Sequence, residues 1–229
     1  MITAGKAHME IITITCRYLF GVNSYILKNE GRCFLIDTGM AKRRAQLEKM
    51  LRETSCQPGD LELIIITHGH LDHVGNTVFL RDKYMAKVAM HKGDYGMVES
   101  GDMFVDTRRG LATRLVGLFM RILGLSHYEK FTPDIYLEDN QDLSAYGLAA
   151  TIVHIPGHSK GSIGVLTSDG DFFCGDLLVN TDKPAMNTLI DDSTEMDVSI
   201  ERLRPLKIKT VYPGHGKPFQ MQRFMEDMR

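Results

Sequence analysis

The feature that most constrains the fold of this chain is a cluster of histidines directly after a short apolar run. The run is Leu63–Ile66, and the cluster is Thr67–Gly75, which reads Thr-His-Gly-His-Leu-Asp-His-Val-Gly. A continuous β-branched run of this length predicts a strand that is buried on both faces. Three imidazoles and one carboxylate are therefore expected where a buried strand ends and the chain turns toward a helix.

The residue types in this cluster indicate a metal site. Neutral imidazole and carboxylate suit zinc and, less selectively, iron or manganese. His68 and His70 are two residues apart on nearly extended backbone, so both can point to one side and share an ion. Asp72 and His73 lie beyond the bend and are expected to face a second position nearby. One His-x-His pair would be weak evidence, but four potential ligands in this register predict metal binding.

The same arrangement recurs along the chain, with an apolar strand followed by a glycine-containing turn that carries a polar side chain. The polar residues in these turns are Asp37, His68 to His73, His158, Asp176 and His215. Loops at strand ends on a rigid sheet are where sites are usually assembled. Any one of these segments could be a plain turn, but together they predict that the turns converge at one edge of a layered fold.

Strand and helix patterns alternate along most of the chain, as in a layered α/β fold. The expected strands are 10–15, 25–28, 33–36, 63–66, 87–90, 151–155, 162–167, 171–174 and 209–212, and the expected helices are 40–53, 74–84 and 195–204. Residues from about 91 to 142 are the least predictable part, and we treat them as a helical insertion near the active site. We expect a single domain over residues 1–229.

One helix is expected inside this insertion, at about residues 108–125. Apolar residues recur there at helical spacing, and they are Leu111, Leu115, Leu118, Phe119 and Ile122. Four arginines lie around them, so the helix is basic and amphipathic. It could cap an apolar substrate pocket, pack on its own domain, contact a second copy in a homodimer, or lie on a membrane, and we favour the first three over the membrane.

Composition narrows the classes of function. The formal net charge of -2 gives no sign of a nucleic-acid-binding protein. The four cysteines lack CxxC spacing, which is typical of reduced, buried thiols. No signal peptide and no membrane-spanning run is evident, so a cytoplasmic protein with a small-molecule substrate is expected.

The motif His-x-His-x-Asp-His resembles the signature of the metallo-β-lactamase-fold metallohydrolases, and the other turns follow in that family's order. The resemblance covers the chain from Tyr18 to Gly216 apart from the insertion. It implies a mixed α/β (α+β) fold, a four-layered αββα sandwich. The motif is most similar to that of glyoxalase II, a thioester hydrolase, although the C-terminal glutathione-binding domain of glyoxalase II is not expected here.

The resemblance also implies a role for each candidate residue. His68, His70 and His158 would hold one divalent ion, and Asp72, His73 and His215 would hold a second. Asp176 would bridge the two ions, and Asp37 would support the metal-binding histidines from behind. Two zinc ions are the first expectation, with iron or manganese as alternatives.

Two such ions, about 3.5–4 Å apart, hold a hydroxide at neutral pH that can attack a carbonyl or phosphoryl group. The expected reaction is hydrolysis of an ester-like bond, in a thioester or a lactone, and Asp72 is the expected proton shuttle. The family's main zinc β-lactamases carry cysteine at the position of Asp176, which argues against a β-lactam as the native substrate. Three alternatives stay open: a mononuclear iron persulfide dioxygenase, a phosphodiesterase of the same fold, and a non-catalytic metal-binding module.

Overall fold

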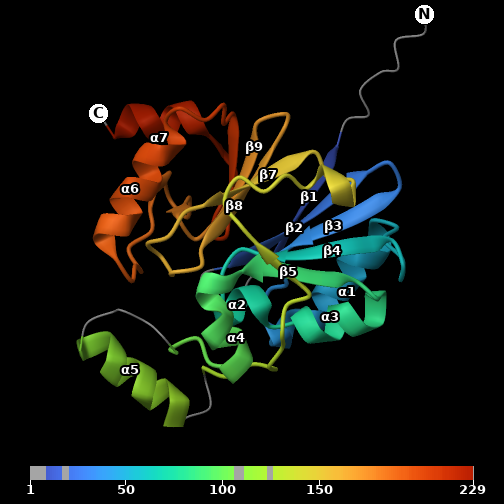
Figure 1. Cartoon of the computed structure of the whole chain (residues 1–229), viewed down its shortest axis with the longest axis horizontal. Coiled ribbons are helices and arrows are strands. Elements are labelled where there is room, and N and C mark those ends of the chain that lie inside the picture. The colour runs from blue at the N-terminus through green and yellow to red at the C-terminus, as the bar shows by residue number, and fades with distance from the viewer. Residues whose placement is uncertain (1–8, 17–20, 106–110, 123–125, 229) are drawn as a thin grey trace, which may run out of the picture.

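The computed structural model describes residues 9–16, 21–105, 111–122 and 126–228. Two β-sheets lie face to face, and helices cover the outer face of each sheet (Figure 1). This is the four-layered helix–sheet–sheet–helix arrangement that was expected. The expected strands are all present, with ends that differ by a few residues.

The first sheet has six strands in chain order. They are β1 (Glu10–Cys16), β2 (Val22–Asn29), β3 (Arg32–Ile36), β4 (Leu61–Ile66), β5 (Lys87–His91) and β6 (Ile135–Leu137). The first three strands pair antiparallel, and β3 to β6 run parallel. Parallel strands place their carboxyl ends at the same sheet edge, so the residues after β3, β4 and β5 gather there.

The second sheet has five strands in the order β13-β12-β9-β8-β7. They are β7 (Ala150–His154), β8 (Ile163–Thr167), β9 (Asp171–Gly175), β12 (Thr210–Pro213) and β13 (Phe219–Gln220). Only β9 and β12 pair parallel, which places their carboxyl ends side by side. A separate ribbon consists of β10 (Leu178–Val179) and β11 (Ala185–Met186).

The helices divide between the two outer layers. Those described are α1 (Arg44–Glu53), α2 (Leu71–Val74), α3 (Thr77–Tyr84), α4 (Tyr95–Ser100), α5 (Leu111–Ile122), α6 (Ser193–Leu203) and α7 (Met221–Asp227), with 3-10 turns η1 (Ala41–Arg43), η2 (Lys92–Asp94) and η3 (Ser144–Tyr146). Helices α1 and α3 cover the first sheet, and α6 and α7 cover the second (Figure 1). None of the helices in the described part of the chain is long and apolar enough to cross a membrane.

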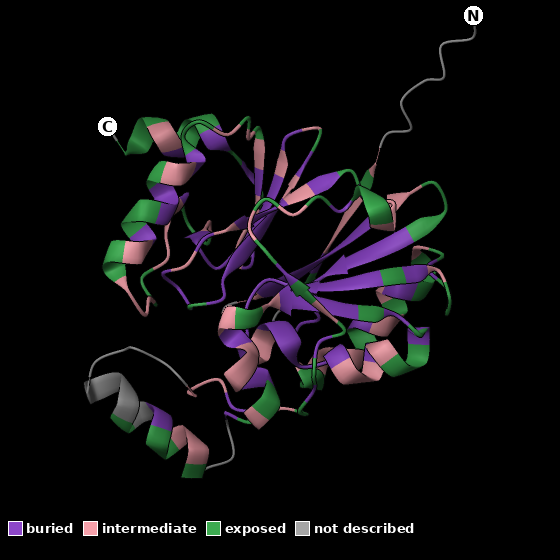
Figure 2. Ribbon diagram, viewed as in Figure 1, coloured by how far each residue is buried: buried purple, intermediate pink, exposed green. Residues whose placement is uncertain are grey.

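Alternating side chains along the strands build three separate cores. In β4, Leu63 and Ile65 point between the sheets, whereas Ile64 and Ile66 point toward α1 and α3. Because both faces of β4 are covered, the strand is apolar without a break, as the sequence indicated. Figure 2 shows buried stretches along the strands of both sheets.

The expected helix over 74–84 is broken into α2 and α3, which is a correction. A Cβ at Gly75 would lie 2.5 Å from the backbone nitrogen of Ala41, so only glycine allows this approach of two loops. The side chain of Asn76 then donates hydrogen bonds to the carbonyls of Thr38 (2.7 Å) and Met40 (3.0 Å). These contacts hold the chain in a turn where helical spacing alone predicted continuation.

Residues 91–142 contain the helices α4 and α5 and also β6, a sheet-edge strand that the sequence did not predict. The ends of the expected helix, 108–110 and 123–125, lie outside the described residues. Large apolar side chains on α5 are more than half exposed, and they are Leu115, Leu118, Phe119 and Ile122. The single-domain organisation, the status of 91–142 as an insertion and the use of this exposed face stay predictions.

Candidate metal centre

The turns that follow five strands meet at one edge of the sandwich. Asp37 follows β3, the histidine motif follows β4, His158 follows β7, Asp176 follows β9, and His215 follows β12. Parallel pairing of β3 with β4 and of β9 with β12 brings these carboxyl ends together.

The predicted ligands fall into three overlapping groups, each with its ligand atoms within 4.8 Å of one another. These groups are His68–His70–His158, His68–His73–Asp176 and Asp72–His73–His215. All seven residues that the sequence singled out as ligands are therefore brought together, on loops from both sheets.

Asp176 lies between the first and the third group. One carboxylate oxygen, Oδ2, lies 3.6 Å from Nε2 of His158 and 3.2 Å from Nε2 of His215. The other, Oδ1, lies 3.4 Å from Nε2 of His73. Asp176 therefore lies within reach of ligand residues from both groups, and its bridging role stays a prediction.

Neighbouring acceptors orient four of the imidazole rings. Nδ1 of His73 lies 2.7 Å from Oδ2 of Asp37, and Nδ1 of His215 lies 2.8 Å from the carbonyl of Gly21. Nδ1 of His158 faces the carbonyl of Leu189. A nitrogen that donates to an acceptor carries the proton, so in each neutral ring the Nε2 lone pair points into the cluster.

His68 is oriented through a relay. The hydroxyl of Thr67 donates to Oδ2 of Asp37 (2.8 Å), so it is free to accept from Nδ1 of His68, 3.0 Å away. Asp37 also accepts from the backbone N–H of Thr67 (2.8 Å). The buried carboxylate of Asp37 thus orients both His68 and His73 through hydrogen bonds.

Two buried atoms in the cluster have no hydrogen-bond partner among the described residues. They are Nε2 of His73 and Oδ1 of Asp176. In addition, Nε2 of His158 lies only 2.9 Å from Nδ1 of His70 and 3.2 Å from Nε2 of His68. Buried polar atoms without partners are costly, and the Nε2 atoms of His158 and His68, whose Nδ1 atoms both donate, face each other as lone pairs that repel. A cation bound among them would remove both costs, so the donor set fits a metal ion.

The pKa values of two histidines in the cluster are shifted in opposite directions. Burial, together with the nearby His73, His158 and His70, holds the pKa of His68 well below its usual value, which keeps that ring neutral. For His215, burial lowers the pKa but the carboxylates of Asp176 and Asp72 outweigh it and raise the pKa to about 10. An ion that binds at His215 must therefore displace a proton.

Asp94 is a residue beside the cluster that the sequence analysis did not single out. Its carboxylate is buried and accepts hydrogen bonds from the loop of the histidine motif and from the loop after His158. Lys92–Asp94 follows β5 with a glycine-containing turn, the same arrangement that identified the other site residues. That signal was present, but it fell within the segment treated as an insertion.

Asn23 was also missed. Its side chain donates to the carbonyls of Pro213 (2.9 Å) and Gly216 (2.8 Å), and it thereby fixes the turn that carries His215. Among the described residues, the other histidines are His91, His127 and His154, and they lie outside the three ligand groups.

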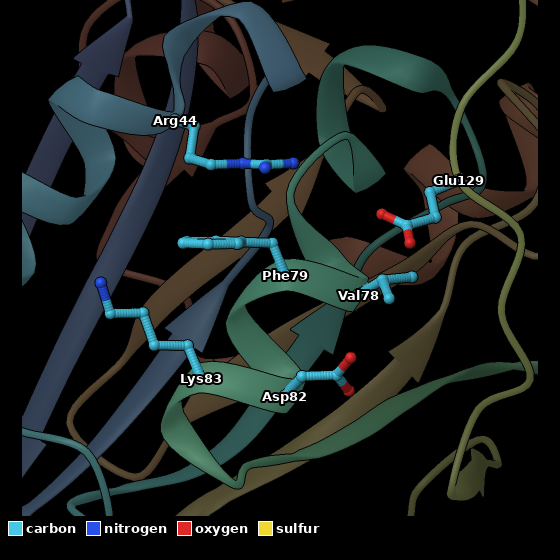
Figure 3. A pocket seen from close by; sticks show the side chains of 6 residues that line it. All are labelled: Arg44, Val78, Phe79, Asp82, Lys83 and Glu129. Carbon is cyan, nitrogen blue, oxygen red and sulfur yellow. The ribbon is translucent and has the colours of Figure 1, made fainter.

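A separate hollow of about 510 Å³ lies on α3, away from the cluster (Figure 3). Its walls are formed by Arg44, Val78, Phe79, Asp82, Lys83 and Glu129. The Arg44 guanidinium lies over the Phe79 ring, 4.2 Å from its centroid, and so occupies this aromatic face itself. None of the seven ligand residues lines the hollow, and we assign it no part in the chemistry.

The comparisons with known proteins agree with this geometry. The chain is 24% identical over 201 residues to Beta-lactamase-like protein 2 homolog of Drosophila melanogaster, an alignment that covers 86% of this chain but only 59% of that protein. It is 27% identical over 174 residues to Hydroxyacylglutathione hydrolase GloC of Haemophilus influenzae, over 75% of this chain and 72% of the relative. Among solved structures, TTHA1623 in a di-iron-bound form superposes with a TM-score of 0.71 at 25% identity, over 92% of this chain and 95% of that one. A model of the metallo-beta-lactamase superfamily matches residues 17–215, and the chain therefore belongs to that superfamily.

Proposed function

We propose that this protein is a metal-dependent hydrolase that holds two divalent ions and acts on an ester-like bond of a small molecule. The observation that carries the proposal is the pair of buried atoms without partners, Nε2 of His73 and Oδ1 of Asp176. His68, His70 and His158 would hold one ion, Asp72, His73 and His215 the other, and Asp176 would contact both. Zinc is the first expectation, and iron or manganese also suits these donors.

The two ions, when bound, would lower the pKa of a water molecule and polarise the substrate's carbonyl oxygen. The residues of the chain supply orientation and proton transfer. Asp37 and Gly21 hold the rings of His73 and His215 with their Nε2 atoms toward the cluster. Two fixed rings on opposite loops leave little freedom in where the reacting groups can lie.

Asp72 is the proposed proton shuttle to the leaving group. Its side chain is 28% exposed, against 7% for Asp176, so it is the cluster carboxylate that a substrate can reach. Oδ2 of Asp72 lies 3.4 Å from Nε2 of His215 and 3.8 Å from Nε2 of His73. Burial works against ionisation, but His73 and His215 bring the pKa of Asp72 down to about 2, so the carboxylate is ionised at neutral pH.

A thioester or a lactone is the proposed substrate class. Support comes from the name of one relative, Hydroxyacylglutathione hydrolase GloC, because an acylglutathione is a thioester. Hydrolysis of either bond produces a carboxylate and a leaving group that needs a proton, which is the role proposed for Asp72.

Metal content and turnover test this proposal together. We expect about two divalent ions per chain by elemental analysis, and hydrolysis of an S-acyl glutathione or a γ-lactone that a chelator abolishes and added zinc restores. Asp72→Asn is expected to keep both ions and lose most turnover. Full turnover in that variant with both ions bound would remove Asp72 from the mechanism. One iron per chain, with oxygen uptake in the presence of a persulfide, would replace the hydrolase by a dioxygenase.

A further inference from the structure

The backbone of Gly69, which lies between His68 and His70, is held on both sides. The backbone N–H of Gly69 donates to Oδ2 of Asp94 (2.8 Å), and its carbonyl accepts from the hydroxyl of Tyr128 (2.7 Å). A Cβ at Gly69 would lie 3.0 Å from Sδ of Met97, so glycine fits here with little room to spare. The spacing of the two imidazoles is therefore set by residues outside the histidine motif.

The same carboxylate also holds the loop that follows His158. Oδ1 of Asp94 accepts from the backbone N–H of Gly161 (2.6 Å), and Oδ2 accepts from the hydroxyl of Ser159 (2.7 Å). That hydroxyl also lies 2.8 Å from the hydroxyl of Ser162. One side chain thus connects the loop of His68 and His70 with the loop of His158.

The loop that carries Asp94 and the loop that follows His158 meet at backbone distance. A Cβ at Gly161 would lie 2.5 Å from the nitrogen of Asp94, and one at Gly93 would lie 2.7 Å from Cα of Gly161. Asp94 itself is 1% exposed, so water does not compete for its oxygens. A contact this close leaves no space for a substitute network of water molecules.

We propose that Asp94 is a positioning residue for the His68–His70–His158 group and not for the Asp72–His73–His215 group. Among the described residues, no hydrogen bond joins Asp94 to Asp72, His73 or His215. Those residues have other supports, Asp37 behind His73 and the carbonyl of Gly21 behind His215. The inference rests on the proposed metal centre. It predicts that a change at Asp94 weakens metal binding by the His68–His70–His158 group and leaves metal binding by the Asp72–His73–His215 group intact.

The variant Asp94→Asn tests this with almost no change in shape. An amide nitrogen replaces one of the two carboxylate oxygens. In one orientation of the side chain this nitrogen faces the backbone N–H of Gly69, and in the other it faces the backbone N–H of Gly161, so one hydrogen bond is lost in either case. The variant is made in two backgrounds, each with one ligand group disabled: His215→Ala leaves the first group, and His70→Ala leaves the second. Zinc affinity is then measured by competition with a chromophoric chelator.

We expect Asp94→Asn to weaken zinc binding about 10- to 100-fold in the His215→Ala background and by less than about twofold in the His70→Ala background. Equal losses in both backgrounds would mean a general structural role and would overturn the inference. No loss in either background would overturn it as well. If the unsubstituted protein binds no zinc, the proposed function fails first, and that result is visible before any variant is made.

A milder variant and a matched control complete the experiment. Ser159→Ala removes one hydrogen bond to Asp94 and is expected to give a smaller loss of zinc affinity with the same selectivity, even if Asp94→Asn does not fold. The control is Asp142→Asn. Asp142 also accepts from a backbone N–H and a hydroxyl, both of Ser144, but lies in an exposed turn. It should leave zinc affinity unchanged in both backgrounds.

Discussion

At the scale of single residues, the cluster depends on acceptors that fix the position of protons. Asp37 serves His73 directly and His68 through the hydroxyl of Thr67. Asp37 has a φ of 57°, in the left-handed region that asparagine and aspartate tolerate better than other side chains. Aspartate therefore meets two requirements at this position. It tolerates the left-handed backbone conformation, and its carboxylate accepts the hydrogen bonds that orient the two rings.

Asp37→Asn separates these two requirements, because asparagine keeps the size and tolerates the backbone conformation. Its amide nitrogen cannot accept from His73 and Thr67 as the second carboxylate oxygen does. The proton of His73 can then move to Nε2, which faces the cluster. We expect metal affinity to fall about 10- to 100-fold in a competition titration. Asp60→Asn, in a turn where Asp60 accepts from the backbone N–H of Gln57, is the control. Unchanged affinity in Asp37→Asn would contradict this role.

The sequence revealed the residues that bear ligand atoms better than those that support them. The seven predicted ligands stand in glycine-containing turns after apolar strands, a local pattern that requires no knowledge of tertiary contacts. Asp94 and Asn23 act by hydrogen-bonding loops that are distant in the chain. The partner of such a residue is decided by packing, so neither the pairing nor its purpose can be predicted from local spacing.

At the scale of elements, the loops at the strand ends carry the ligand residues, and the helices pack against the sheets that position those loops. Helix α6 packs against the outer face of the second sheet through Met196, Ile200 and Leu203. It begins after Asp192, whose Oδ1 accepts from the backbone N–H groups of Thr194 (3.0 Å) and Glu195 (3.1 Å). The sequence predicted this helix two residues too short at its start, because helical spacing does not identify the N-cap.

Asp192→Ala removes this cap and should lower the free energy of unfolding by about 1 kcal/mol in a urea titration. The loss arises because two backbone N–H groups of the first turn lose their acceptor. Asp197→Ala, at an exposed position inside the same helix, is the matched control and should not destabilise. Equal destabilisation by both substitutions would show that the cap contributes nothing specific.

At the scale of the whole molecule, the two sheets meet through side chains from both. Their shared core includes Phe34, Leu63 and Ile65 from the first sheet and Val165 and Phe173 from the second. The alternation that predicts which strand residues are buried does not tell which sheet they pack against. Helix α5 was predicted from its helical spacing, but the exposure of its apolar side chains was not. The strand β6 was not predicted, because three residues are too few to show a strand pattern.

A stack of two histidines joins the sheets at one side. The rings of His91, at the end of β5, and His154, at the end of β7, lie 4.0 Å apart. Burial, and then the neighbouring His154 and Lys92, lower the pKa of His91 to about 4, against an opposing effect of Asp139. The unfolded chain, with an ordinary value of about 6.5, takes up this proton first as the pH falls.

Stability of the metal-free protein should therefore decline between about pH 6.5 and pH 4, and His91 should contribute part of that slope. In the structure, the backbone N–H of Gly93 donates to Nδ1 of His91 (3.1 Å). The variant His91→Asn keeps an acceptor for this N–H, but its amide side chain cannot be protonated in this pH range. Urea unfolding from pH 4.5 to 7.5 is expected to show a shallower decline in the variant. A variant that loses stability with acid as steeply as the unsubstituted protein would exclude His91 as a source.

The division of the cluster between the two sheets has a consequence for how the chain is made. A ribosome delivers Thr67–Gly75 well before His158, Asp176 and His215. Until residue 215 has emerged, no nascent chain can complete either the Asp72–His73–His215 group or the contact of Asp176 with it. The His68–His70–His158 group can form once residue 158 has emerged, whereas the complete pair of groups requires His215. The two halves of the centre therefore become available in a fixed order during synthesis.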